Sequence, residues 1–169
     1  MDEFCSQWSG HVRFRHFKWV PPANRHITLH YLGATSPGQL EMLKQSLTTL
    51  ADFPAFSSQL QGLGVFPDKQ NPRVLWAGVA LDPQLECLYR QLLELVVACG
   101  FTPEKHDYHP HVTLARMGSG CDDVISELLD GHKTVVWTEI AVRQVTLFES
   151  VSSPVGVQYL PLFNIELRG

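Results

Sequence analysis

The sequence lacks the features of membrane, secreted and disulfide-stabilised proteins. No apolar stretch reaches the roughly 18 residues that a membrane-spanning helix needs. The first residues, Met1-Asp2-Glu3-Phe4-Cys5, contain no basic region followed by an apolar segment, unlike a signal peptide. The four cysteines are scattered, and no C-x-x-C pair occurs. We therefore expect a soluble, cytoplasmic protein with reduced thiols and no membrane partner.

An excess of positive charge is also missing. The formal net charge is −4, whereas proteins that coat long nucleic acids present a basic surface that neutralises many phosphates. If nucleic acid is the partner, a few residues must hold one end or one linkage of it. The 169 residues suit a single domain, and the hydrophobic and charged shares of 44% and 18% are those of an ordinary globular protein.

The order of the predicted helices and strands indicates an α+β fold. Proline directly after a capping residue marks the start of helices at 36–51 and 83–99, and a third helix is predicted at 122–130. Turn-forming residues at 67–72 and 152–156 predict hairpins, and hence antiparallel pairing. The predicted strands are 25–32, 56–66, 73–81, 109–116, 136–149 and 156–167. We expect two antiparallel sheets with outer helices around a central cleft.

A His-x-Thr motif occurs twice, as His26-Ile27-Thr28 and His111-Val112-Thr113, and each copy is followed by a glycine, Gly33 or Gly118. A helix and two strands are predicted after each copy, which indicates a pseudo-twofold repeat of structure. Residues i and i+2 of a strand point to one face, so each motif presents an imidazole and a hydroxyl about 6.5 Å apart along the strand. Two such pairs facing one another from opposing strands would form a symmetrical acid/base site.

Alternation along the predicted strands assigns the neighbouring side chains to faces. In the first strand His30 shares the face of the motif side chains, and Arg116 in the second falls on the wrong face unless that strand ends or bulges after Leu114. The residues of the first strand that are expected in the core are Ile27, Leu29 and Tyr31.

The paired motifs suit the chemistry of phosphodiester cleavage. Histidine has an ordinary pKa of about 6.5, so one copy can accept a proton while a second donates one near neutral pH. In-line displacement needs both, because a base activates the attacking oxygen while an acid protonates the leaving oxygen. His26 and His111 would fill these roles. Thr28 and Thr113 would hold the non-bridging oxygens, and Arg116 would add a fixed positive charge. The scheme needs no metal or other cofactor.

A zinc site built from His109, His111 and either His26 or His30 is a competing interpretation. It is disfavoured because no carboxylate or cysteine has ligand-like spacing. The remaining histidines are expected on the solvated surface: His11, His16, His106 and His132. Three aromatic residues are expected in the core or on a groove wall rather than as base-stacking platforms: Trp76, Phe66 and Phe148.

Five segments around the motifs occur in a distinctive order, followed by a closing Tyr159-x-Pro-Leu stretch. They are Trp19-Val20-Pro21-Pro22-Ala23-Asn24, His26-Ile27-Thr28-Leu29-His30-Tyr31-Leu32-Gly33, Arg73-Val74-Leu75-Trp76-Ala77-Gly78, His109-Pro110-His111-Val112-Thr113-Leu114-Ala115-Arg116 and Val145-Thr146-Leu147-Phe148-Glu149-Ser150. This series, from about residue 18 to the end, resembles the two-histidine (2H) phosphoesterase superfamily. Within it, the chain resembles the RNA 2′,3′-cyclic phosphodiesterases once named 2′-5′ RNA ligases.

The resemblance implies a bilobal fold and metal-free hydrolysis of a terminal 2′,3′-cyclic phosphate to a 2′-phosphate. In some members it also implies reversible joining of RNA ends through a 2′-5′ bond. Carried over by residue, His26 and His111 become the acid/base pair, Thr28 and Thr113 hold the phosphate, and Arg116 is an additional phosphate ligand.

The chain departs from the family in two places. Members usually begin with a hydrophobic strand, whereas this chain starts at Met1-Asp2-Glu3-Phe4. Either the recorded start is internal, or another strand or another chain covers that edge of the sheet. We expect residues 1–169 to form a single bilobal domain. His30 stands where a small or basic residue is expected, and it is either a substrate contact or a residue of the rim.

The leading hypothesis is a monomeric hydrolase that opens 2′,3′-cyclic phosphate ends of RNA through the two histidines. Two alternatives stay open. One is a 2′-5′ RNA ligase, or a phosphodiesterase acting on 2′-5′ oligonucleotides or cyclic nucleotides. The other is a module that binds RNA ends without catalysis.

Overall fold

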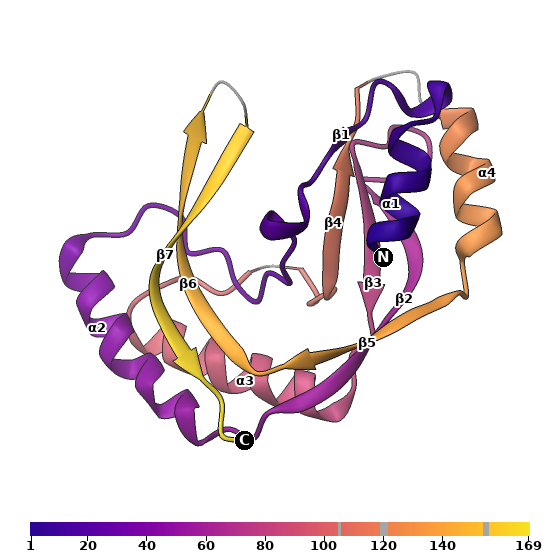
Figure 1. The fold of residues 1–169 in the computed structure, drawn as a ribbon. Coiled ribbons are helices and arrows are strands. Elements are labelled where there is room, and N and C mark those ends of the chain that lie inside the picture. Colours follow the sequence, from indigo (N-terminus) through magenta and orange to yellow (C-terminus); the bar gives the residue numbers. More distant parts are fainter. Residues whose placement is uncertain (105, 119–121, 154–155) are drawn as a thin grey trace. The chain divides into compact units, whose positions relative to one another are not determined.

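The computed structural model describes residues 1–104, 106–118, 122–153 and 156–169, which form two compact units (Figure 1). The first unit comprises residues 1–28, 59–80 and 109–140, and the second comprises residues 29–58, 81–108 and 141–169. Across the described ranges, no helix is both long and apolar enough to cross a membrane. The single bilobal domain with a central cleft that is expected for residues 1–169 stays a prediction.

The first unit is built on a five-stranded sheet in the order β1-β4-β3-β2-β5. Neighbouring strands from β1 to β2 pair antiparallel, as the predicted hairpin at 67–72 requires. The strands are β1 (Lys18–Trp19), β2 (Phe56–Phe66), β3 (Val74–Val79), β4 (His111–Arg116) and β5 (Val136–Val142). The helices of this unit are α1 (Asp2–Ser9) and α4 (Asp122–His132), with 3-10 turns η1 (Val12–Phe14) and η2 (Pro22–Asn24).

One face of this sheet forms the hydrophobic core of the unit. Along β3 buried and half-buried residues alternate, as expected for a strand with one covered face. Figure 1 shows α1 and α4 on the same side of the sheet, which we call the helix face. Burying one large aliphatic or aromatic side chain contributes about 1.5–3 kcal/mol. The buried side chains of this core include Leu63, Leu75, Ala77, Val112, Leu114, Ala115, Ile125, Leu128 and Leu129.

An aromatic cluster joins α1 to α4 and β5. The ring of Phe4 lies 5.4 Å from that of His132 and 4.8 Å from that of Trp137, and His132 stacks on Trp137. His132 was expected on the solvated surface, and this prediction is wrong. The last turn of α4 carries its ring against the N-terminal helix, and its Nδ1 lies 2.8 Å from the carbonyl oxygen of Leu128.

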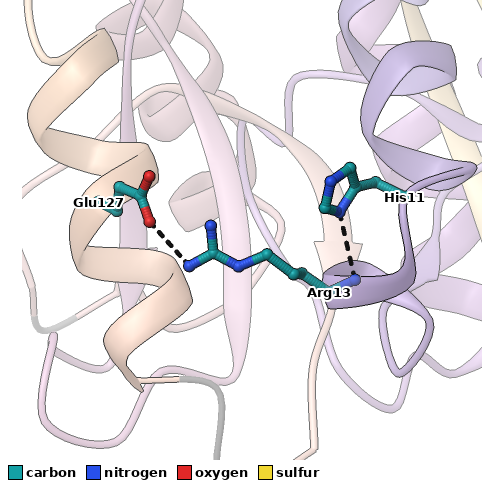
Figure 2. Close-up of polar contacts among 3 residues, drawn as sticks. All are labelled: His11, Arg13 and Glu127. Carbon is teal, nitrogen blue, oxygen red and sulfur yellow. Dashed lines mark hydrogen bonds and ion pairs between the residues drawn. The ribbon is translucent and has the colours of Figure 1, made fainter.

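An ion pair also ties the N-terminal segment to α4. Arg13 in η1 donates a hydrogen bond of 2.7 Å to the Glu127 carboxylate (Figure 2). This hydrogen bond, together with the charge of Arg13, lowers the pKa of Glu127 from its ordinary value of 4.5. Both side chains are largely exposed, so solvent screens the interaction and its contribution to stability is small.

The second unit contains two long helices and a two-stranded sheet. Its elements are α2 (Pro37–Leu47), η3 (Thr48–Asp52), α3 (Pro83–Ala98), β6 (Gln144–Ser153) and β7 (Gly156–Glu166). Both helices begin where the sequence predicts: Ser36 and Gln39 form a capping box, and Asp82 accepts two backbone N–H bonds at the start of α3. Strands β6 and β7 pair antiparallel, although residues 154 and 155 of their predicted turn lie outside the described residues.

The α+β class with two antiparallel sheets and flanking helices is thus confirmed, but two strand predictions are wrong. Residues 25–32 form no strand beyond one bridge at Ile27, and Tyr31, expected in the core, is 72% exposed. No ladder continues past the residues next to that bridge, so the alternation of faces is not imposed as far as Tyr31. The strand predicted at 136–149 is divided at Arg143 into β5 and β6, which belong to different sheets.

The Arg13–Glu127 pair generates a prediction about pH. A carboxylate whose pKa is lower in the folded state stabilises that state above its unfolded pKa, and the stabilisation is lost as the pH falls through the folded pKa. Wild type is therefore expected to be slightly more stable than Glu127→Gln near neutral pH, with the difference shrinking as the pH falls below 4.5. Urea unfolding midpoints of the two proteins across this range measure it.

Arg13→Gln is the matched control, because it removes the partner and leaves the carboxylate in place. In that background Glu127→Gln is expected to have no pH-dependent effect on the midpoint. An equal difference between wild type and Glu127→Gln at acidic and neutral pH contradicts the assignment.

Candidate active site

The two His-x-Thr motifs lie side by side in the first unit. Ile27 and Val112, the middle residues of the motifs, form an antiparallel bridge at the free edge of β4. The segment of the first motif continues the line of β1, whose residues Lys18 and Trp19 pair with the other end of β4. The motifs were expected in separate halves of the molecule, whereas the structure brings them together on neighbouring segments of one sheet.

The register of this bridge determines how the four motif side chains are arranged. With Ile27 opposite Val112, His26 stands opposite Thr113 and Thr28 stands opposite His111. Val112 is buried on the helix face, so these four side chains belong to the other face of the sheet, which we call the motif face. The two histidines are diagonal neighbours, a relation that places residues about 7–8 Å apart. A local twofold axis between Ile27 and Val112 relates the motifs.

The two imidazoles are held by equivalent hydrogen bonds. Nδ1 of His26 lies 2.8 Å from the carbonyl oxygen of Asn24, and Nδ1 of His111 lies 2.7 Å from that of His109. In each motif the partner is the backbone two residues earlier. A carbonyl oxygen can only accept, so Nδ1 carries the proton and the Nε2 of a neutral ring keeps its lone pair. In both motifs Nε2 is therefore the nitrogen suited to take up a proton.

A β-bulge brings Arg116 onto the motif face. Leu75 pairs with Ala115 and Trp76 pairs with Thr113, so Leu114 is an extra residue between consecutive pairs of the ladder. Leu114 and Ala115 are both buried, and the face changes after them. Arg116 is exposed and shares the face of Thr113. Of the two possibilities that the sequence left open for this arginine, a strand end or a bulge, the structure has the bulge.

Aromatic side chains flank His111 on the same face. The ring centroids of Phe66 and Trp76 lie 5.0 and 5.9 Å from that of His111, and 5.2 Å from each other. Trp76 is half-buried and its ring lies over Gly64, where an added Cβ would come within 2.1 Å of the indole. Only glycine leaves room for this placement. Phe66 and Trp76, expected in the core or on a groove wall, thus lie directly beside a motif histidine.

The other candidate residues are placed differently. His30 belongs to the second unit. Within the described part of the chain, its two buried ring nitrogens have no hydrogen-bond partner. Its contact with substrate stays a prediction. His109 is exposed and contributes its carbonyl oxygen to His111. Among the described residues, no group of three or more His, Cys, Asp and Glu side chains is arranged to hold a metal ion.

Two features of the motif face were not predicted from the sequence. One is the contact of the aromatic rings with His111. The other is Lys18, which pairs directly with Arg116 and therefore shares its face. The predicted strand began at residue 25, so β1 was overlooked. A strand of two residues, Lys18 and Trp19, is too short to show an alternating pattern in the sequence.

The carbonyl contacts generate a prediction about histidine tautomers. Neutral His26 and His111 are expected as Nδ1–H tautomers, and His11 as the Nε2–H tautomer, because Nδ1 of His11 accepts a bond of 3.3 Å from the Arg13 N–H (Figure 2). Long-range ¹H–¹⁵N NMR at a pH where the rings are neutral distinguishes the two forms. An Nε2–H tautomer at both His26 and His111 contradicts the assignment of Nε2 as the proton acceptor.

The sequence also matches a family of known proteins. Residues 3–76 and 79–159 match the family described as LigT like Phosphoesterase. A similar protein from Aquifex aeolicus, named RNA 2′,3′-cyclic phosphodiesterase, is 34% identical over 155 residues, which span 90% of this chain and 82% of that protein.

Solved structures share the fold. The protein TT0787 of Thermus thermophilus superimposes with a TM-score of 0.78 at 27% identity, covering 99% of this chain and 90% of that one. E. coli LigT complexed with 3′-AMP gives a TM-score of 0.74 at 24% identity, covering 98% of this chain and 90% of that one. The family match spans most of the sequence and includes both His-x-Thr motifs. The chain belongs to the LigT-like phosphoesterase family.

Proposed function

We propose that the protein hydrolyses 2′,3′-cyclic phosphate ends of RNA to 2′-phosphates. The observation that carries the proposal is the twofold arrangement of the motifs on one sheet face, with each imidazole held through Nδ1 by a backbone carbonyl. Two proton-transfer groups about 7–8 Å apart can flank one phosphorus atom. The name of the Aquifex aeolicus relative supports RNA with a 2′,3′-cyclic phosphate as the substrate class.

The reaction is an in-line displacement at phosphorus. Nε2 of one histidine removes a proton from water as its oxygen forms a bond to phosphorus. The bond from phosphorus to the 3′ oxygen breaks, and the other histidine, protonated at the start, gives its Nε2 proton to that oxygen. The product carries a 3′ hydroxyl and a 2′-phosphate. Because the motifs are related by a twofold axis, the direction in which substrate binds decides whether His26 or His111 is the base.

The remaining side chains of the motif face hold the negative charge that the reaction concentrates on phosphorus. Each threonine lies opposite the histidine of the other motif, so Thr28 and Thr113 can donate hydrogen bonds to non-bridging oxygens from two sides. Arg116 adds a guanidinium that matches the geometry of phosphate. No step requires a metal ion or a cofactor, and we propose that the protein acts as a monomer.

Substitution of the histidines tests the proposal. Wild type is expected to convert an oligoribonucleotide ending in a 2′,3′-cyclic phosphate to the 2′-phosphate in the presence of EDTA. His26→Ala and His111→Ala are each expected to lower kcat by at least about 100-fold, the typical contribution of a general acid or base. Chromatography of the products against 2′- and 3′-phosphate standards measures both the rate and the site of cleavage.

His106→Ala is the control, because this histidine is exposed and lies outside both motifs. Full turnover in both motif variants would refute the roles assigned to the histidines. A panel including a 2′-5′-linked dinucleotide and an RNA carrying a 5′ hydroxyl separates hydrolysis of the cyclic end from the alternative phosphodiesterase and ligase reactions. Binding of the cyclic end without turnover would indicate a module that has lost catalysis.

The acid/base scheme also predicts the pH dependence of the reaction. One histidine must be neutral and the other protonated, so kcat/KM of wild type is expected to follow a bell-shaped curve. Each alanine variant removes one of the two groups, so its residual activity is expected to lose one limb of the curve. Rates measured across the pH range for wild type and both variants check this. A bell that persists in both variants means that other groups transfer the protons.

A further inference from the structure

Two cations stand directly opposite each other beside the motifs. Lys18 of β1 pairs with Arg116 of β4, and both side chains are exposed. Like charges at directly opposite positions of an antiparallel pair destabilise the sheet. The chain has 17 acidic residues against 13 lysines and arginines, so carboxylates are available in the sequence. Within the described ranges, however, neither cation has an ion-pair partner.

The register of the sheet explains why nothing in the sheet neutralises this pair. Across the sheet from Lys18 and Arg116, the next residues in line on the motif face are Val74 of β3 and Phe66 of β2, which are apolar. The adjacent line contains Thr113, Trp76 and Gly64. Among these described positions, no carboxylate stands in either line. Lys18 and Arg116 can therefore bind an anion that comes from outside the protein.

The position of the pair indicates which anion. Arg116 follows Thr113 on the motif face across the bulge, a distance of two strand positions, or about 6.6 Å. Arg116 can therefore reach back to the phosphate held by the motifs. Lys18 lies on the far side of Arg116 from β3, on the line that also carries the first motif, and so it adds a second positive charge about two strand positions from the motifs. One nucleotide of an extended strand spans a comparable length.

We propose that Lys18 binds the phosphodiester that precedes the terminal nucleotide, so that the site recognises the end of an RNA strand in preference to a lone cyclic mononucleotide. This inference rests on the proposed function, because it takes the motifs as the binding site of the cyclic phosphate. Lysine suits the role, since its ammonium group is a mobile point charge that attracts phosphate without demanding one geometry. The neighbouring arginine provides the directional contact.

A matched pair of substrates isolates this contact. Both are dinucleotides that end in a 2′,3′-cyclic phosphate; in one the single internal linkage is an ordinary phosphodiester, and in the other it is an uncharged methylphosphonate. Wild type is expected to prefer the charged dinucleotide. In Lys18→Gln the ratio of the two kcat/KM values is expected to fall about tenfold, as for the loss of one hydrogen bond to a charged group. Lys18→Arg, which keeps the charge, is expected to restore most of the ratio.

Lys133→Gln is the control for net charge. Lys133 is exposed in the same unit, directly before β5, at the opposite edge of the sheet from β1. Its substitution is expected to leave the ratio unchanged. The dependence of affinity for the charged dinucleotide on salt provides a second readout, and this dependence is expected to be weaker in Lys18→Gln alone.

The outcomes separate this inference from the proposed function. If wild type hydrolyses neither dinucleotide, the proposed function fails, and titration with the corresponding 2′-phosphate dinucleotides still reveals whether Lys18 senses the internal charge. If Lys18→Gln lowers kcat/KM equally for the charged and uncharged dinucleotides, Lys18 serves the reacting phosphate and the inference is wrong. An unchanged ratio with unchanged rates means that Lys18 is a surface residue only, which also overturns it.

Discussion

The site depends on one backbone pairing, the antiparallel bridge between Ile27 and Val112. A shift of this pairing by one residue would turn the side chains of the first motif to the opposite face, because alternate residues of an extended chain point in opposite directions. Two features hold the register. Lys18 and Trp19 pair with the same strand, and the η2 turn between them and the motif sets the length of the connection. The twofold relation of the motifs follows directly from antiparallel pairing.

The two faces of the sheet in the first unit have different roles: the helix face stabilises the fold, and the motif face carries the candidate active site. The helix face buries leucine, valine and aromatic side chains against α1 and α4, while the motif face carries histidine, threonine, lysine and arginine. The bulge at Leu114 affects both faces. It buries Leu114 and Ala115 on the helix face and places Arg116 on the motif face. Among the described residues neither cation on this face has an ion-pair partner, and the like charges weaken the sheet. The phosphate binding that we propose offers a physical reason for their presence.

Local signals in the sequence were sufficient for much of the fold. Ser36-Pro37 and Asp82-Pro83 predict the starts of α2 and α3, because a side-chain cap and a fixed proline φ act within one helical turn. The hairpin of β2 and β3 was equally predictable. The strand expected at 25–32 was wrong beyond Ile27, since an apolar alternating pattern shows that a segment can pair but not that a partner strand is present. The sequence also did not predict β1 or the position of Lys18 within it.

The sequence by itself determined which groups the site contains: two His-x-Thr motifs, a nearby arginine and an order of elements typical of the family. It also determined that Arg116 shares their face only if the strand ends or bulges after Leu114. Only the tertiary structure decided that the motifs are neighbours, which carbonyl oxygens hold their Nδ1 atoms, and that Lys18 stands beside Arg116. The reason is physical, because pairing between segments eighty-five positions apart depends on the packing of the whole sheet, and no local residue preference encodes it.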